Sequence, residues 1–73
     1  MLNYYLNSNT QSNGDHEVHK ETCPYYYNYK IGGNFIYIGT FFNEQEAVKQ
    51  AKKLYPVYKI DGCAHCCPKA HRS

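Results

Sequence analysis

The sequence predicts an α+β fold in which a small antiparallel sheet of three to four strands carries one main helix, about residues 44–55, on one face. Three observations support this prediction. Short segments rich in aromatic and β-branched residues alternate with turn-forming residues, which is typical of strands. One segment places its apolar residues at helical spacing. Two Cys/His pairs stand near opposite ends of the chain, where they can tie the ends of the fold together.

The length of 73 residues indicates a single domain, with a core over about residues 2–67 and a frayed polar tail over 68–73. A domain of this size buries only about 60% of the surface that its unfolded chain exposes, so we expect a stabilising cross-link. The hydrophobic fraction of 42% includes nine tyrosines, whose rings pack while their hydroxyls stay in water. This composition suits a thin sheet with one helix on it.

The first two strands are expected at residues 2–7 and 16–20. In the second strand Val18 lies on one face and His19 on the other, because successive side chains of a strand point to opposite sides. Residues 7–15 are polar and contain an Asn-Gly pair, which indicates a loop or turn.

An aromatic stretch follows the second strand. Pro24 ends that strand because proline has no amide hydrogen to donate. Residues 25–31 and 34–39 are both rich in β-formers and are separated by Gly32-Gly33, which favours a hairpin. A long loop over the sheet is the alternative for residues 25–31. The tyrosines suit packing and cross-strand pairing better than a base-stacking platform.

The main helix has clear start and stop signals. Asn43 can cap it, Glu46 stands three residues later as in a capping box, and Pro56 ends it. Its apolar face comprises Ala47, Val48, Ala51, Leu54 and Tyr55. Residues 57–60 then alternate as a short last strand, and Asp61-Gly62 reads as a turn that delivers Cys63.

The two Cys/His pairs have the spacing of metal ligands. Two residues separate Cys63 from Cys66, so one tight turn can aim both sulfurs at a single point. Three residues separate His19 from Cys23, which add an imidazole and a third thiol. Together they form a closed tetrahedral ligand set for Zn²⁺, without a vacancy for a catalytic water. Such an ion would join distant parts of the chain and couple folding to metal binding.

Four further side chains are close enough in sequence to replace a ligand, namely His16, His65, Cys67 and His71. Cys67 directly follows Cys66, so its side chain points away from the same ion; we expect a buried apolar residue or an idle thiol. For the three histidines we expect ordinary surface positions.

Four segments, in this order, resemble the metal-binding domain of Ada-type DNA alkylation-repair proteins and their short bacterial relatives; they are residues 18–23, 34–39, 43–48 and 62–66. The resemblance implies a small α+β module that holds zinc, with Cys23, Cys63 and Cys66 on positions of metal cysteines. In the repair proteins the first ligand is a cysteine that accepts a methyl group from a DNA phosphotriester, and this chain has His19 there. A zinc-bound imidazole accepts a methyl group poorly, so we do not expect that repair chemistry.

Charge and composition narrow the partners and the location. The formal charge is +2 and Arg72 is the one arginine, which disfavours sequence-specific reading of duplex DNA. Lysines opposite the apolar face of the helix, Lys49, Lys52 and Lys53, leave open a weak contact with a nucleic-acid backbone or a protein. No targeting segment and no apolar run of about 18 residues is visible, so we expect a cytoplasmic protein without membrane contact, a monomer or weak dimer. In that reducing setting the four cysteines suit metal binding better than disulfides.

The leading functional hypothesis is therefore a non-catalytic, zinc-stabilised binding module with an unidentified partner, possible association with nucleic acid included. One alternative is a thiol or redox enzyme that uses Cys66 or Cys67 beside His65 or His71, which requires a lowered thiol pKa. A metal-free small domain and a secreted protein with two disulfides are the others.

Overall fold

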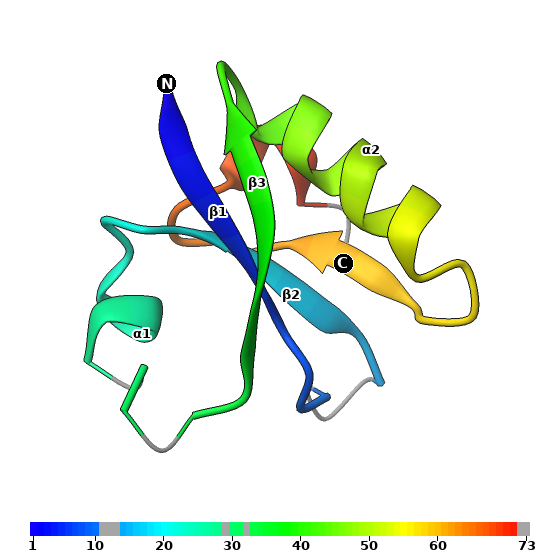
Figure 1. Cartoon of the computed structure of the whole chain (residues 1–73), viewed down its shortest axis with the longest axis horizontal. Coiled ribbons are helices and arrows are strands. Elements are labelled where there is room, and N and C mark those ends of the chain that lie inside the picture. Colours follow the sequence, from blue (N-terminus) through cyan, green and yellow to red (C-terminus); the bar gives the residue numbers. More distant parts are fainter. Residues whose placement is uncertain (11–13, 29, 32, 72–73) are drawn as a thin grey trace.

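A computed structural model describes residues 1–10, 14–28, 30–31 and 33–71. Within these ranges the chain forms a four-stranded sheet with the strand order β3-β1-β2-β4 (Figure 1). The elements are β1 (Leu2–Asn7), β2 (His16–Lys20), α1 (Pro24–Tyr27), β3 (Phe35–Phe41), α2 (Glu44–Leu54), β4 (Ile60–Gly62) and the 3₁₀-helix η1 (Pro68–Ala70). The predicted α+β class with one main helix is confirmed.

The sheet is mixed, whereas the sequence predicted an antiparallel one. Strand β1 pairs antiparallel with β2 and β3, but β4 pairs parallel with β2, with Val18 opposite Gly62. The reason lies in the connection from β3 to β4. Helix α2 carries the chain across the sheet and back to the end from which β3 started, as parallel crossovers do. Strand β4 therefore runs in the direction of β3, which is also the direction of β2.

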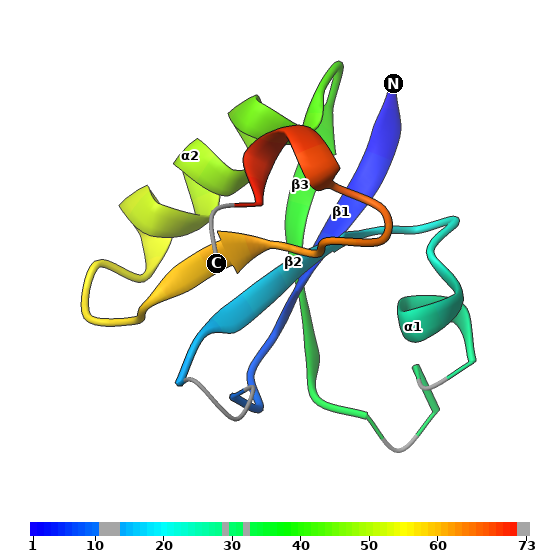
Figure 2. The ribbon, with the colours of Figure 1, turned by 180° about the vertical axis from the view of Figure 1, so that it is seen from behind.

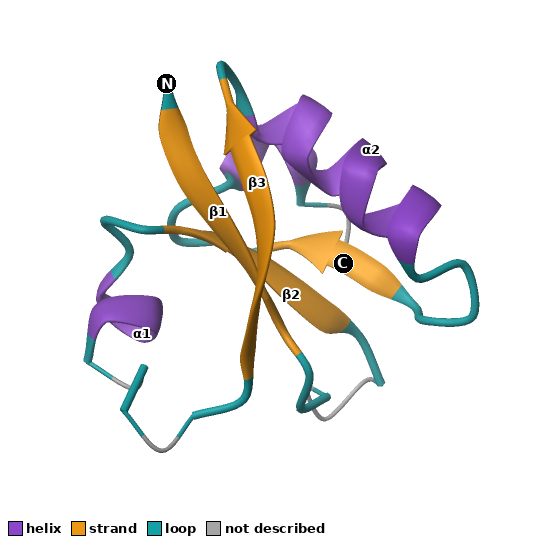
Figure 3. Ribbon diagram, viewed as in Figure 1, coloured by secondary structure: helices purple, strands orange, loops and turns teal. Residues whose placement is uncertain are grey.

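The core lies between one face of the sheet and α2 (Figure 3). Its buried members include Tyr4, Leu6, Val18, Ala47, Val48 and Ala51. The helix begins at the predicted position, because the Asn43 side chain accepts a hydrogen bond of 2.9 Å from the backbone N–H of Glu46. Helix α2 and the other helices of the described residues are too short and too polar to cross a membrane.

The predicted strand over residues 25–31 is wrong. Pro24 starts α1 instead, with Cys23 at its N-cap, because proline suits the first position of a helix. The ring of Tyr26 stacks on Tyr5 at a centroid distance of 4.1 Å, on the sheet face opposite Leu6. Strand β3 pairs with β1 and not with residues 25–31, so the predicted hairpin does not form. Its Gly32, like residues 11–13 of the predicted loop at 7–15, lies outside the described residues.

The carboxyl end also differs from the prediction. The last strand is Ile60–Gly62 and not residues 57–60, so Asp61-Gly62 belongs to the strand and is not a turn. The tail is not frayed at residues 68–71. Its 3₁₀-helix packs beside the start of α2 (Figure 2), where Glu44 Oε2 accepts a hydrogen bond of 2.8 Å from the backbone N–H of Lys69. Residues 72–73 lie outside the described part of the chain.

Candidate metal centre

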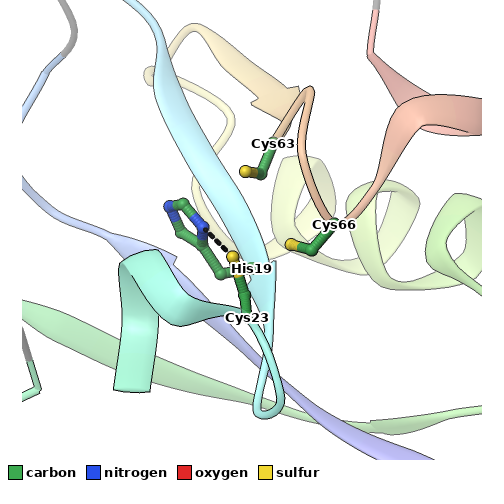
Figure 4. A group of neighbouring side chains, drawn as sticks. All are labelled: His19, Cys23, Cys63 and Cys66. Atoms are coloured by element: carbon green, nitrogen blue, oxygen red, sulfur yellow. Dashed lines mark hydrogen bonds between the residues drawn. The ribbon is translucent and has the colours of Figure 1, made fainter. Parts of the chain in front are cut away.

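The structure brings together the four side chains that the sequence singled out. His19, Cys23, Cys63 and Cys66 point toward one common point (Figure 4), and one ligand atom from each lies within 4.8 Å of the others. A tetrahedron with metal bonds of about 2.0–2.3 Å has edges of about 3.3–3.8 Å, so small side-chain adjustments would complete the geometry. Three of the four residues are buried and Cys66 is partly buried.

The first pair sits where β2 turns into α1. His19 ends the buried part of β2, and its Nδ1 lies 3.6 Å from the Cys23 sulfur. The backbone N–H of Cys23 donates to the carbonyl of Lys20, which closes a tight turn between the two ligands. The carbonyl of Cys23 in turn accepts from the first N–H groups of α1. The short helix thus fixes the Cys23 side chain beside the imidazole.

The second pair lies in a turn directly after β4. The N–H of Cys63 donates to Val18, which continues the pairing of β4 with β2. The N–H of Cys67 donates to the carbonyl of Cys63 at 2.7 Å and so closes the turn that carries Cys66. Strand pairing therefore delivers the sulfurs of this pair to the end of β2, next to His19.

A carboxylate supports the imidazole from behind. Nε2 of His19 lies 3.7 Å from Oε1 of Glu17, while Nδ1 faces the sulfurs. With a metal on Nδ1, the Nε2 hydrogen would point at Glu17, an arrangement that fixes the ring orientation of many metal-bound histidines. The ring of Phe35 packs edge-on against His19 at 5.7 Å. Burial raises the pKa of Glu17 above its ordinary value.

The thiols of the cluster hold their protons tightly. Burial raises the pKa of Cys23. The hydrogen bond with Cys66, and then burial, raise the pKa of Cys63 to about 12. For Cys66, the hydrogen bond with Cys63 lowers the pKa, but the contact with Cys67 and burial outweigh it, so the pKa is raised. Without a metal these groups are neutral thiols and not activated nucleophiles.

The spare candidates lie elsewhere or play other parts. Cys67 is fully buried in the core, as expected, although its sulfur lies 3.6 Å from that of Cys66. His65 is exposed, but the expected surface position is wrong for His16, which is 8% exposed because its ring stacks on Tyr58. His71 is half-buried, with Nδ1 3.2 Å from Oδ2 of Asp61.

The four cysteines, all within the described ranges, are free, which disagrees with the two-disulfide alternative. Sequence reasoning also missed the supporting position of Glu17. Its place two residues before His19 on the same strand face was the signal that could have found it. No protein-family model, curated protein or solved structure matches the chain, so the resemblance to Ada-type domains stays a prediction.

Proposed function

We propose that His19, Cys23, Cys63 and Cys66 bind one Zn²⁺ ion, and that this ion stabilises a small non-catalytic binding module. The observation that carries the proposal is the convergence of the four ligand atoms within 4.8 Å at a largely buried point. Three sulfurs and one imidazole form a ligand set typical of structural zinc, because thiolates and imidazole suit this borderline-soft ion and four protein ligands fill its tetrahedron.

The position of the ligands supports a stabilising role. One pair belongs to the β2–α1 turn and the other to the turn after β4, and 39 residues lie between Cys23 and Cys63. Structural zinc sites bind with apparent free energies of about 10–16 kcal/mol at neutral pH. Whole domains are stable by only about 5–15 kcal/mol, so the ion would account for much of the stability of so small a core.

The raised thiol pKa values speak against the alternative of a thiol or redox enzyme. A catalytic cysteine needs an accessible thiolate, which a lowered pKa supplies. Here the pKa is raised for Cys23, Cys63 and Cys66, and Cys67 is fully buried. These cysteines suit metal coordination better than nucleophilic attack.

Native mass spectrometry before and after dialysis against a strong chelator tests the proposal. We expect one metal ion per chain and loss of the folded state when the metal is removed. Cobalt substitution should give the visible absorption of a tetrahedral site together with sulfur-to-metal charge transfer. A metal-free protein that keeps its full fold in chelator would overturn the proposal.

For the partner we propose a weak contact through the lysine face of α2. Lys49, Lys52 and Lys53 are exposed on this helix, on the side away from its buried Ala47 and Ala51. Phosphate groups are the natural partners of such a face, and their binding falls steeply with salt. Fluorescence anisotropy with a labelled oligonucleotide at several salt concentrations is the measurement. Equal binding by a Lys49→Gln, Lys52→Gln, Lys53→Gln triple variant would contradict it.

A further inference from the structure

A cavity of about 640 Å³ opens beside the metal centre. His19 and Cys63 form part of its wall, so it borders the site directly. The rest of the wall comes from several elements and includes Asn7, Glu17, Tyr25, Asn34, Phe35 and His65. Pockets for small ligands have volumes of about 300–1,000 Å³, so the cavity has room for an organic group rather than a single ion.

The charges at the cavity wall are negative. Among the described residues that line it, Glu17 bears the one carboxylate, and neither lysine nor arginine contributes. Glu17 is partly buried, and its nearest ion-pair contact is the imidazole of His19 at 3.7 Å. A zinc ion bound by three thiolates and a neutral imidazole adds a net charge of about −1 at the same wall. An anionic ligand would therefore be repelled, and a cationic ligand would be attracted.

Aromatic rings complete the wall. Tyr25 and His65 meet edge-on at a centroid distance of 5.5 Å, and Phe35 lies against the ring of His19. Tyr26 packs edge-on on Phe35 at 5.1 Å and so holds that ring in place. Aromatic faces attract ammonium and guanidinium groups, by about 0.5–2 kcal/mol depending on how far the cation is desolvated. An acidic side chain and several aromatic rings around one cavity form a site of this kind.

We propose that this cavity binds an organic cation, a primary ammonium or guanidinium group, with Glu17 as its counter-ion and Tyr25 and Phe35 as its aromatic walls. The group belongs either to a free amine or to a lysine or arginine side chain of a partner protein. This proposal deepens the binding-module function and rests on the zinc site for part of its negative charge. It concerns the sheet face that carries Tyr5 and α1, and so leaves the lysine face of α2 free for a separate contact.

The test is a titration of the metal-loaded, ¹⁵N-labelled protein with n-butylammonium and with ethylguanidinium, followed by NMR. Butyrate and butanol serve as an anionic and a neutral control of the same chain length. We expect saturable shifts at the amides of Glu17, Tyr25 and Phe35 with the two cations and none with the controls. Equal shifts with butyrate or butanol, or no saturable shift with either cation, would overturn the proposal.

Two variants and one matched control locate the site. Glu17→Gln and Tyr25→Leu should each weaken n-butylammonium binding, by about tenfold for Glu17→Gln, which corresponds to about 1.4 kcal/mol. Glu46→Gln removes the same charge from the exposed side of α2 and should leave binding unchanged. Tyr25 is 55% exposed, so its variant tests the cavity even if Glu17→Gln disturbs the metal centre. Unchanged binding in Tyr25→Leu would contradict the proposal.

Native mass spectrometry of each sample separates this proposal from the zinc proposal. One bound metal without cation binding would refute the cavity site and leave the zinc site standing, whereas a chain without metal would refute the zinc site. Putrescine and a short lysine-containing peptide with blocked ends then distinguish the two sources of the cation. Tighter binding of the peptide assigns a partner side chain, and tighter binding of putrescine assigns a free amine.

Discussion

The backbone N–H of Lys20 lies 3.3 Å from the sulfur of Cys66 and donates a hydrogen bond to it. This contact joins the end of β2 to the turn after β4, across 46 positions of the sequence. An N–H group aimed at a sulfur favours the thiolate over the thiol and so prepares Cys66 for a metal. The backbone of β2 thus contributes to the proposed centre alongside the side chain of His19.

Loss of one sulfur should abolish tight metal binding. Cys23→Ser replaces a buried ligand and leaves three, so we expect no retained metal in native mass spectrometry and a loss of cooperative unfolding. Cys67→Ala is the matched control, because Cys67 is equally buried but lies outside the ligand set. It should keep one metal ion and lose only about 1–2 kcal/mol of stability from the cavity it leaves. Metal loss in Cys67→Ala would instead place that sulfur among the ligands.

Glu44 should contribute strongly to stability for a surface-type residue. It is 7% exposed, accepts the Lys69 N–H at 2.8 Å, and lies 3.8 Å from Nζ of Lys20. Glu44→Ala leaves that N–H without its partner, and we expect a loss of about 1–3 kcal/mol in urea denaturation. Glu46→Ala removes the same charge from the same helical turn at an exposed position and should cost less than about 1 kcal/mol. Equal losses in the two variants would contradict this role.

The local signals of the sequence predicted the sheet, the main helix and the four converging side chains. Asn43 before an amphipathic segment is a local signal, and it placed α2 to within one residue. The spacing of each Cys/His pair is also local, which is why the pairs could be recognised before any fold was known. That they meet in space followed from one physical requirement, namely that each pair alone fills only half of a tetrahedral site.

The errors came from contacts between distant parts of the chain. Residues 25–27 have strong β propensity, but Pro24 starts a helical turn and Tyr5 offers a ring on which Tyr26 stacks. Tertiary packing therefore overrode local preference. The alternation at residues 57–60 likewise suggested a strand, but Val57 is 90% exposed and the pairing begins only at Ile60. Which residues pair with β2 depends on how closely the following turn can approach.

That approach predicts a sensitive glycine at position 62. A Cβ atom on Gly62 would lie 2.9 Å from the carbonyl oxygen of Cys67 and 3.0 Å from the backbone of Ala70. Neither backbone atom can move without opening the turn that carries Cys66. We expect Gly62→Ala to lower the free energy of unfolding by about 1–3 kcal/mol and to weaken metal binding. A urea midpoint and a metal affinity equal to those of the unchanged protein would show that the turn has more room than the structure indicates.

Metal binding should release protons and strengthen as pH rises. The pKa values of Cys23, Cys63 and Cys66 are raised, so without metal these thiols are protonated at neutral pH, and each must lose its proton to bind. The sign follows directly, because protons compete with the metal and a fall in pH favours release. With up to three protons exchanged, the affinity should change by up to about a thousandfold per pH unit.

Competition with a chelator of known protonation constants, between about pH 6 and pH 8, measures this slope. Calorimetry in two buffers of different ionisation enthalpy counts the released protons independently. A Cys67→Ala variant should show the same proton count, because that thiol stays out of the ligand set. A proton count near zero would mean that the thiols are already ionised without metal, which contradicts the buried, mutually hydrogen-bonded cluster described above.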